Sequence, residues 1–226
     1  WNNLNDDGTP NENTMHQAHP VIKGNKTIIT KWFRQTSLGI TKKEELNKHV
    51  KIFTKKGFKK SNLDNELFKK LDSFYKEKKD EFKDEFVAGN FIQSDLSNVP
   101  SSLLDLTDDL RQNIHSALKK PLEKWSQNNL EPTFVYGIRD YKEGAVLVPH
   151  RDRENTHIIS AIINIAKDVE EDWPLVIEDH FYRKHEIFLE PGEVIFYESA
   201  RLLHGRPYPL NGKSFANIFC HYRPID

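Results

Sequence analysis

The apolar positions before residue 120 recur with the period of two α-helices. The first set occupies positions i, i+1, i+4, i+7 and i+8 of one helix face: Leu67, Phe68, Leu71, Phe74 and Tyr75. Asn62 or Asp64 is suited to cap the start of this helix. The second helix is predicted to begin near Thr107, and Pro121 to end or restart it, because proline disrupts a helix interior. Both apolar faces predict packing against a core.

From Pro132 onward the apolar period changes to that of β-strands. Short strands are predicted over Thr133–Asp140, Ala145–His150, His157–Ala166, Leu175–Glu178, His185–Leu189, Glu193–Tyr197, Leu203–Tyr208 and Ser214–Tyr222. Turn residues separate most of them, including Glu143-Gly144, Pro191-Gly192 and Asn211-Gly212. Many short strands at even spacing indicate a sandwich or barrel, and preceding helices can cover one sheet face. The sequence therefore predicts an α+β domain.

The region before residue 62 has a different character. Residues 36–62 are polar and rich in lysine, which is typical of a solvated linker, and we place the linker at residues 36–56. Residues 1–35 contain the turn-forming run Asp6–Pro10 and a β-like run at Thr27–Phe33. Because the chain begins at Trp1, without an initiator methionine, we expect it to be part of a longer protein.

The amino-acid composition excludes several kinds of partner and site. The 226 residues are 37% apolar, which is enough for one well-filled core. The 33 basic and 34 acidic residues nearly cancel, so no overall charge favours nucleic acid or an anionic membrane as a partner. No apolar run approaches the ~18 residues of a membrane span. The single cysteine, Cys220, excludes an internal disulfide and a cysteine-ligated zinc site, and it fits a reducing compartment such as the cytoplasm.

A histidine and an aspartate at the end of the second predicted strand carry the main chemical signal. Residues i and i+2 of a strand point to the same face, so His150 and Asp152 converge on one point. Two histidines and one carboxylate on one face of an octahedron leave three positions open, which is the arrangement of non-haem Fe(II) oxygenases. His204, on a later strand, is the predicted third ligand. The pair alone is a weak signal, and the ordered set of motifs around it strengthens the interpretation.

That ordered set resembles a known family. Tyr141-Lys-Glu-Gly144 followed by Pro149-His150-Arg151-Asp152 looks like the metal-binding signature of the prolyl 4-hydroxylase-like 2-oxoglutarate/Fe(II)-dependent dioxygenases. Leu189–Phe196, then His204 and Gly212-Lys213, continue the resemblance. The resemblance implies a double-stranded β-helix (jelly-roll or cupin-like) with N-terminal supporting helices over residues 57–226.

The resemblance also implies a reaction. Iron, held by His150, Asp152 and His204, would bind 2-oxoglutarate, and O2 would be consumed as succinate and CO2 form and a substrate C–H bond is hydroxylated. The expected substrate is a prolyl residue of a peptide or protein, and ascorbate is implied as a further cofactor. The protein itself would supply ligand geometry, a dry pocket and substrate orientation.

The distal carboxylate of 2-oxoglutarate needs a cation, and two candidates compete. The family places a lysine or arginine about nine residues after the second histidine, and Lys213 stands there. Arg206 lies two residues after His204 on the same predicted strand, and a guanidinium binds a carboxylate bidentately. One departure is Leu147, which stands where the family often has a tyrosine that donates to the cosubstrate. The remaining tyrosines and histidines of the strand region are expected to be packing or surface groups.

Residues 1–35 resemble the last two core strands of the same family. His16 matches the second iron histidine and Lys26 the cosubstrate lysine, while His19 stands where a cysteine is common. No His-x-Asp pair precedes them. We therefore interpret residues 1–35 as the tail of a truncated upstream dioxygenase domain, which cannot form a complete iron site within this chain.

Two other functions remain open. The chain could be a degenerate, non-catalytic β-helix module that binds a partner, an interpretation that Leu147 supports. It could also be a cupin-like metal enzyme without 2-oxoglutarate, in which no cation would reach the metal. A different peptidyl side chain or a small metabolite is the alternative to a prolyl substrate. The family resemblance also allows the endoplasmic reticulum as a compartment, and oligomeric state is not predicted.

Overall fold

The computed structural model describes residues 11–14, 16, 19, 21–28 and 49–225. The chain divides into two compact units, residues 1–38 and 39–226. In the first unit, the described part contains a short 3-10 helix, η1 (Glu12–Thr14), and His16 and Lys26 are exposed. The β-like run at Thr27–Phe33 and the linker expected at 36–56 lie largely outside the described residues.

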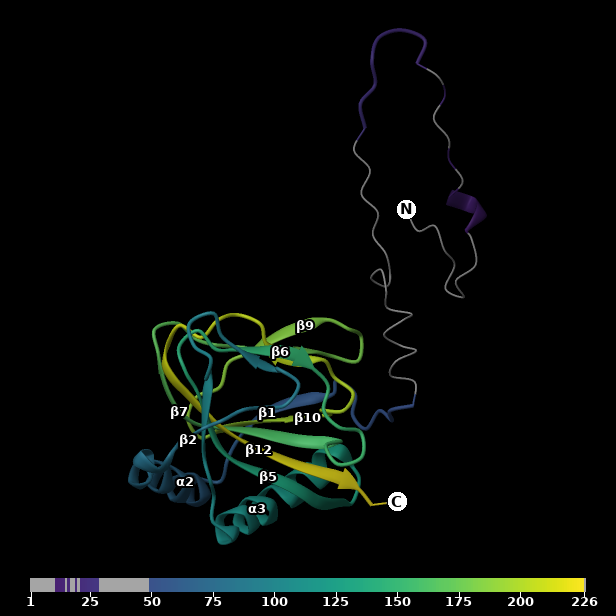
Figure 1. Cartoon of the computed structure of the whole chain (residues 1–226). Helices are drawn as coiled ribbons and strands as arrows, with labels where there is room; N and C mark the ends of the chain where they lie inside the picture. The colour runs from purple at the N-terminus through teal and green to yellow at the C-terminus, as the bar shows by residue number, and fades with distance from the viewer. Residues whose placement is uncertain (1–10, 15, 17–18, 20, 29–48, 226) are drawn as a thin grey trace. The chain divides into compact units, whose positions relative to one another are not determined.

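The second unit is built on two antiparallel sheets (Figure 1). The larger sheet has the strand order β1 (Phe58–Asn62), β10 (Glu193–Tyr197), β7 (Ile159–Val169), β12 (Gly212–Pro224), β5 (Leu130–Tyr141), β4 (Ser101–Leu104) and β2 (Lys83–Asp84). The smaller sheet has the order β3 (Ile92–Gln93), β6 (Val146–His150), β11 (His204–Arg206), β8 (Leu175–Glu178) and β9 (Lys184–Ile187). This is the expected α+β, jelly-roll double-stranded β-helix.

All of the strands predicted after Pro132 are present, two of them with the predicted bounds. The strands before them, β1 to β4, were not predicted. β1 lies at the end of the lysine-rich stretch, where Phe58 is buried and Lys59 and Lys60 point to solvent. Exposed lysines are common on an edge strand, because they discourage pairing with other chains.

Two helices cover the larger sheet on the side away from β6 and β9 (Figure 1). The first, α2 (Asn65–Glu77), is capped by the Asp64 carboxylate, which accepts hydrogen bonds from two backbone N–H groups of the first turn. A 3-10 turn, η2 (Lys79–Glu81), follows. The second, α3 (Asp108–Ser126), is capped by Thr107.

Pro121 does not end α3, contrary to one of the two sequence expectations. The helix continues through it to Ser126. Leu118 and Leu122, on either side of the proline, are buried in the core, while Pro121 itself is exposed. Packing of the apolar face therefore outweighs the one backbone hydrogen bond that proline removes.

Successive residues of the large sheet face two different cores. Ile163 and Phe196 pack with the helices, whereas Ile162 and Tyr197 pack between the two sheets. β7 is therefore an almost continuous buried run and not an alternating strand. Ile162 and Tyr197 of the core between the sheets also line the cavity that contains the candidate site.

Candidate metal centre

Adjacent strands of the smaller sheet place the two candidate histidines. His150 ends β6 and His204 begins β11, and the two are direct partners in the antiparallel register. The register shifts before Arg206, which pairs with Leu147. Gly205 permits this close approach, since a Cβ there would lie 2.7 Å from the Leu147 carbonyl oxygen. The local sequence thus fixes the histidine pair through backbone pairing.

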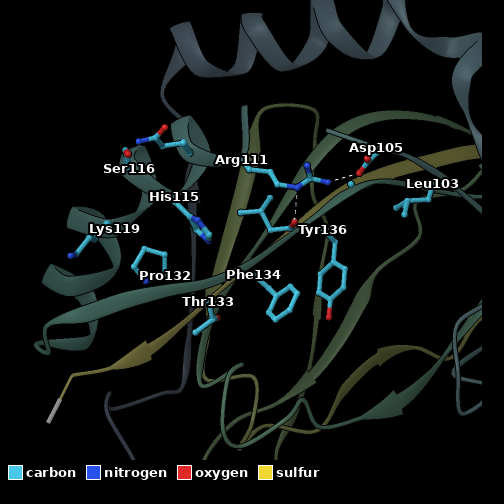
Figure 2. A pocket seen from close by; sticks show the side chains of 13 residues that line it. Leu103, Asp105, Arg111, His115, Ser116, Lys119, Pro132, Thr133, Phe134 and Tyr136 are labelled. Carbon is cyan, nitrogen blue, oxygen red and sulfur yellow. Dashed lines mark hydrogen bonds and ion pairs between the residues drawn. The ribbon is translucent and has the colours of Figure 1, made fainter. Parts of the chain in front are cut away.

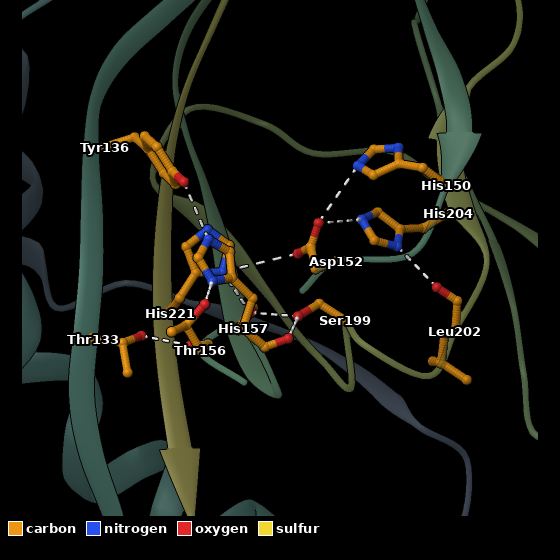
Figure 3. Close-up of polar contacts among 11 residues, drawn as sticks. Thr133, Tyr136, His150, Asp152, Thr156, His157, Ser199, Leu202, His204 and His221 are labelled. Atoms are coloured by element: carbon orange, nitrogen blue, oxygen red, sulfur yellow. Dashed lines mark hydrogen bonds and ion pairs between the residues drawn. The ribbon is translucent and has the colours of Figure 1, made fainter. Parts of the chain in front are cut away.

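The candidate carboxylate comes from the loop after β6. The Asp152 backbone N–H donates to the Ser199 carbonyl oxygen at 3.0 Å. Asp152 Oδ1 lies 3.5 Å from His150 Nε2 and 3.9 Å from His204 Nε2 (Figure 3). One ligand atom from each of the three residues lies within 4.8 Å of the others. The structure therefore brings together all three residues named as ligands from the sequence.

The hydrogen bonds of the two imidazoles fix which nitrogen faces the centre. His150 Nδ1 donates to the Val148 carbonyl oxygen at 2.8 Å, and His204 Nδ1 donates to the Leu202 carbonyl oxygen at 2.9 Å. A carbonyl oxygen only accepts, so each Nδ1 carries the hydrogen. In the neutral rings the lone pairs are then on Nε2, directed at Asp152. Such backbone contacts typically orient histidine ligands of metals.

The pKa values of His204 and Asp152 favour the protonation states that bind a cation. Burial lowers the pKa of His204 to about 4, so this ring is neutral at neutral pH. Burial alone would raise the pKa of Asp152, but the hydrogen bond with His150 and the neighbouring His204 and His221 hold that pKa below its usual range. Asp152 Oδ2 is buried without a hydrogen-bond partner among the described residues. A neutral imidazole and a buried carboxylate fit a divalent ion such as Fe(II).

The three residues open onto a cavity of about 480 Å³. Tyr136, Arg139 and Tyr141 of β5 line it, and Leu147 lies in its wall where the family often has a tyrosine. Tyr197 of β10 also lines it and packs edge-on against His204, with ring centres 4.8 Å apart. These tyrosines, expected to be packing groups, therefore border the site as well.

Lys213 does not reach this cavity. The register of β12 shifts between Gly212 and Ser214, and Lys213 is the extra residue of that bulge. Its side chain is 85% exposed and lies 3.9 Å from Asp168. Phe215, two residues on, is buried in the core between the sheets. The expectation that Lys213 faces the cosubstrate is not met.

Arg206, the competing candidate, is buried and, like Lys213, is not among the residues that line the metal cavity. Its guanidinium lies between the rings of Trp173 and Phe215, 4.7 and 4.4 Å from their centres, and donates to the Trp173 carbonyl oxygen. Among the described residues it has no acidic partner, and its second terminal nitrogen has no hydrogen bond. Burial lowers its pKa to about 10, which leaves it cationic at neutral pH. A buried cation without a counter-charge is costly, so this position calls for an anion.

Two histidines that were expected to be ordinary packing groups lie beside the centre. His157 and His221 stack with ring centres 3.9 Å apart, and both line the cavity. His221 Nδ1 lies 3.9 Å from Asp152 Oδ2 (Figure 3). Ser199 donates to the His157 carbonyl oxygen, so it accepts from Ser160, which in turn accepts from His221 Nδ1. In the sequence, the one feature that could have placed His221 beside the centre was its position near the end of the last predicted strand.

A second hollow, of about 720 Å³, lies between α3 and β5 and shares Tyr136 with the metal cavity (Figure 2). Its guanidinium, from Arg111, is already engaged with Asp105 and with the Val135 carbonyl oxygen. The metal-type cluster of the described residues lies in the other cavity. The chemistry that the sequence indicated therefore belongs to the cavity of His150.

Comparisons with known proteins give structural matches. No protein-family model and no curated protein matches the chain. A prolyl 4-hydroxylase from Pseudomonas putida matches with a TM-score of 0.50 and 15% identity over 76% of this chain and 94% of that one. A prolyl hydroxylase from Trichoplax adhaerens, in complex with a hypoxia inducible factor peptide, matches with a TM-score of 0.55 and 13% identity over 83% and 94%. HygX from Streptomyces hygroscopicus, with nickel, 2-oxoglutarate and hygromycin B bound, matches at 0.54 and 13% over 81% and 86%.

None of the helices in the described part of the chain has the length and apolar character needed to cross a bilayer. The match to each of these solved structures covers most of both chains. The chain has the double-stranded β-helix fold of the prolyl 4-hydroxylase-like 2-oxoglutarate/Fe(II)-dependent dioxygenases.

Proposed function

We propose that the protein is an Fe(II)- and 2-oxoglutarate-dependent dioxygenase that hydroxylates a C–H bond, with iron held by His150, Asp152 and His204. The observation that carries the proposal is the convergence of one atom from each residue, with both Nδ1 atoms already committed to backbone carbonyls. This leaves two Nε2 atoms and a carboxylate for one ion. The set leaves coordination positions for a cosubstrate.

The cosubstrate carboxylate is assigned to Arg206 and Tyr141. Arg206 is a buried cation with an unused N–H, and the Tyr141 hydroxyl is buried without a hydrogen-bond partner among the described residues. Tyr141 lines the metal cavity and packs edge-on on Trp173, the ring that also covers Arg206. A guanidinium and a hydroxyl match the two oxygens of a carboxylate.

Bound Fe(II) and 2-oxoglutarate would supply the oxidising chemistry, with succinate and CO2 as products. The residues of the chain bind and orient. His150, Asp152 and His204 hold the ion, and Arg206 fixes the far end of the cosubstrate. Tyr197 and Leu147 make the cavity wall apolar close to the ligands and restrict water there.

The substrate class follows less directly than the cofactors. A prolyl residue of a peptide or protein is the first candidate, supported by the likeness to two prolyl hydroxylases, one solved with a peptide. The likeness to HygX, solved with hygromycin B, supports a small molecule as the second candidate. Phe86 and Phe91 lie at the cavity and are exposed, which suits an apolar substrate group such as a pyrrolidine ring.

The test is turnover of 2-oxoglutarate by the purified chain. With Fe(II), ascorbate and candidate peptides, we expect succinate to form and a peptide to gain one oxygen atom by mass spectrometry. His150→Ala should abolish both. His16→Ala, which removes an exposed histidine of the first unit, should change neither. Absence of succinate in the wild-type protein under all these conditions would favour the non-catalytic binding module.

A further inference from the structure

One short loop holds both halves of the candidate metal site. This ligand loop, Glu198–Leu202, lies between β10 and β11. Its Ser199 carbonyl oxygen accepts from the backbone N–H of Asp152 at 3.0 Å, and its Leu202 carbonyl oxygen accepts from His204 Nδ1 at 2.9 Å. Any shift of the loop therefore moves the carboxylate and one imidazole together.

The ligand loop makes a third contact of the same kind. The Arg201 carbonyl oxygen accepts from Arg151 Nε at 2.8 Å, and Arg151 stands between the ligands His150 and Asp152. Three carbonyl groups of one loop thus position the segment 150–152 and His204. The N–H groups of Arg201 and Leu202 donate to the Glu198 carbonyl oxygen and close the loop as a turn, and the Ser199 hydroxyl donates to the His157 carbonyl oxygen.

The segment just before β1, Val50–Gly57, is packed against this loop. We call it the N-terminal strap; it leads into β1 (Figure 1). The carboxylate of Glu198 accepts from the backbone N–H of Phe53 at 3.1 Å and of Thr54 at 2.8 Å, and from the Thr54 hydroxyl at 2.6 Å. Glu198 is 1% exposed. Phe53 and Thr54, near the end of the expected linker, are therefore attached to the domain, while the lysines beside them are exposed.

Two further contacts join the strap to the ligand loop. The Glu198 backbone N–H donates to the Gly57 carbonyl oxygen at 2.9 Å, and the Arg201 guanidinium donates to the Val50 carbonyl oxygen. Gly57 has φ +90°, and a Cβ there would lie 2.6 Å from a methyl carbon of Leu202. The strap backbone thus lies directly on the residue whose carbonyl orients His204.

The buried charge of Glu198 depends on hydrogen bonds from the strap. In the described part of the chain Glu198 has no lysine or arginine partner, and His180 Nε2, at 3.2 Å, is its one side-chain nitrogen contact. A buried carboxylate needs several hydrogen-bond donors to offset its lost hydration, and three of them come from Phe53 and Thr54. Removing those donors leaves the carboxylate to find others by moving the loop.

We propose that the N-terminal strap sets the geometry of the metal site, with Thr54 and Glu198 as positioning residues that act through the ligand loop. This inference rests on the proposed function only in that the three ligands bind a divalent ion. Strap, loop and ligands form one chain of contacts, from Thr54 to Glu198, then to Ser199 and Leu202. Weakening the contact between Thr54 and Glu198 should therefore weaken metal binding by Asp152 and His204.

The test is a titration of the full chain with Co(II), whose absorption spectrum reports its ligands. Thr54→Val keeps the shape of the side chain and removes the hydroxyl. We expect it to weaken Co(II) binding about tenfold, the range seen when groups behind metal ligands are removed, and to alter the spectrum. Thr54→Ser should restore both, because it keeps the hydroxyl. Lys55→Ala, which changes the exposed next residue, should leave both as in the wild type.

The outcomes separate this inference from the function on which it rests. Wild-type protein that binds no Co(II) overturns both. Wild-type protein that binds Co(II), with a folded Thr54→Val that binds equally well, overturns the strap proposal alone. Glu198→Gln supplies a second variant, with near-ultraviolet circular dichroism as the check on folding. Equal Co(II) affinity in folded Glu198→Gln overturns the proposal in the same way.

Discussion

His150 and His204 are direct cross-strand partners in the β6–β11 pair, and their ring centres lie 4.6 Å apart. Their separation is therefore set by backbone pairing, in which a slip of one residue would turn a side chain to the opposite face. Asp152 is different, because it comes from a loop and depends on the carbonyl of Ser199 for its position. The strands thus set the backbone positions of the two histidines, whereas Asp152 and the ring orientation of His204 depend on the ligand loop.

The close pairing of β6 and β11, which carry the two histidines, depends on Gly205. A Cβ there would meet the Leu147 carbonyl oxygen at 2.7 Å and the backbone of Pro149 at 2.8 Å. We expect Gly205→Ala to force β6 and β11 apart, to lower stability by about 1–3 kcal/mol and to abolish tight metal binding. Urea denaturation and Co(II) titration measure the two effects. Val176→Ala on the neighbouring strand β8 is the control and should retain metal binding.

Substitutions of the two candidate cations, Arg206 and Lys213, should have different effects on the KM for 2-oxoglutarate. Replacing Arg206 removes charged hydrogen bonds to the cosubstrate worth about 1.5–3 kcal/mol, so we expect Arg206→Met to raise the KM for 2-oxoglutarate roughly 10- to 100-fold. Lys213→Ala should leave KM unchanged, because that side chain is exposed. Without cosubstrate, Arg206→Met should not lower the melting temperature, because a buried cation without a counter-charge is removed. The reverse order of KM effects would return the assignment to Lys213.

A buried ion pair in the cavity wall offers a test of stability. Arg139 binds Glu85 bidentately, at 2.6 and 2.7 Å, and both side chains are nearly buried. Arg139→Met leaves the Glu85 charge unpaired, and we expect a loss of about 3–5 kcal/mol in the free energy of unfolding. The double variant with Glu85→Gln should recover most of it. Additive losses in urea denaturation would show that the two residues do not act as a pair.

The stability of the metal-free protein should fall in mild acid. Burial lowers the pKa of His157, His115 and His221, that of His221 to about 3. In the unfolded chain these rings take up protons near pH 6.5, so below that pH the unfolded state binds more protons than the folded one. We expect the urea midpoint to decrease as the pH falls from about 6.5 toward 4. In His157→Phe, with one titrating ring fewer, the decrease should be smaller, and a midpoint independent of pH would contradict this account.

The strands were predictable because period-two patterns and turn residues reflect burial directly. β8 and β10 have the bounds that the sequence indicated, and His150 and His204 meet because both are strand positions, whereas Asp152 reaches them from the loop after β6. Lys213 was misplaced because the expectation counted residues along the chain, whereas a bulge at that residue turns its side chain outward. The register of a bulge depends on the partner strand, which a sequence pattern does not show.

The strap escaped prediction for another reason. Its lysines are exposed and suggest a linker, whereas its attachment uses the backbone N–H groups of Phe53 and Thr54. Every residue except proline carries such a group, so composition contains no trace of it. Contacts between main chain and a distant side chain become visible only in three dimensions.

The contact between Phe53 and Glu198 spans 145 residues of the chain. Closing so long a loop is entropically costly and comes late in folding, after local helices and hairpins. During synthesis the beginning of the domain must therefore wait for almost its entire length to emerge before the two can meet. Nascent chains should acquire affinity for metal only late in this process, when Phe53 and Glu198 have come together.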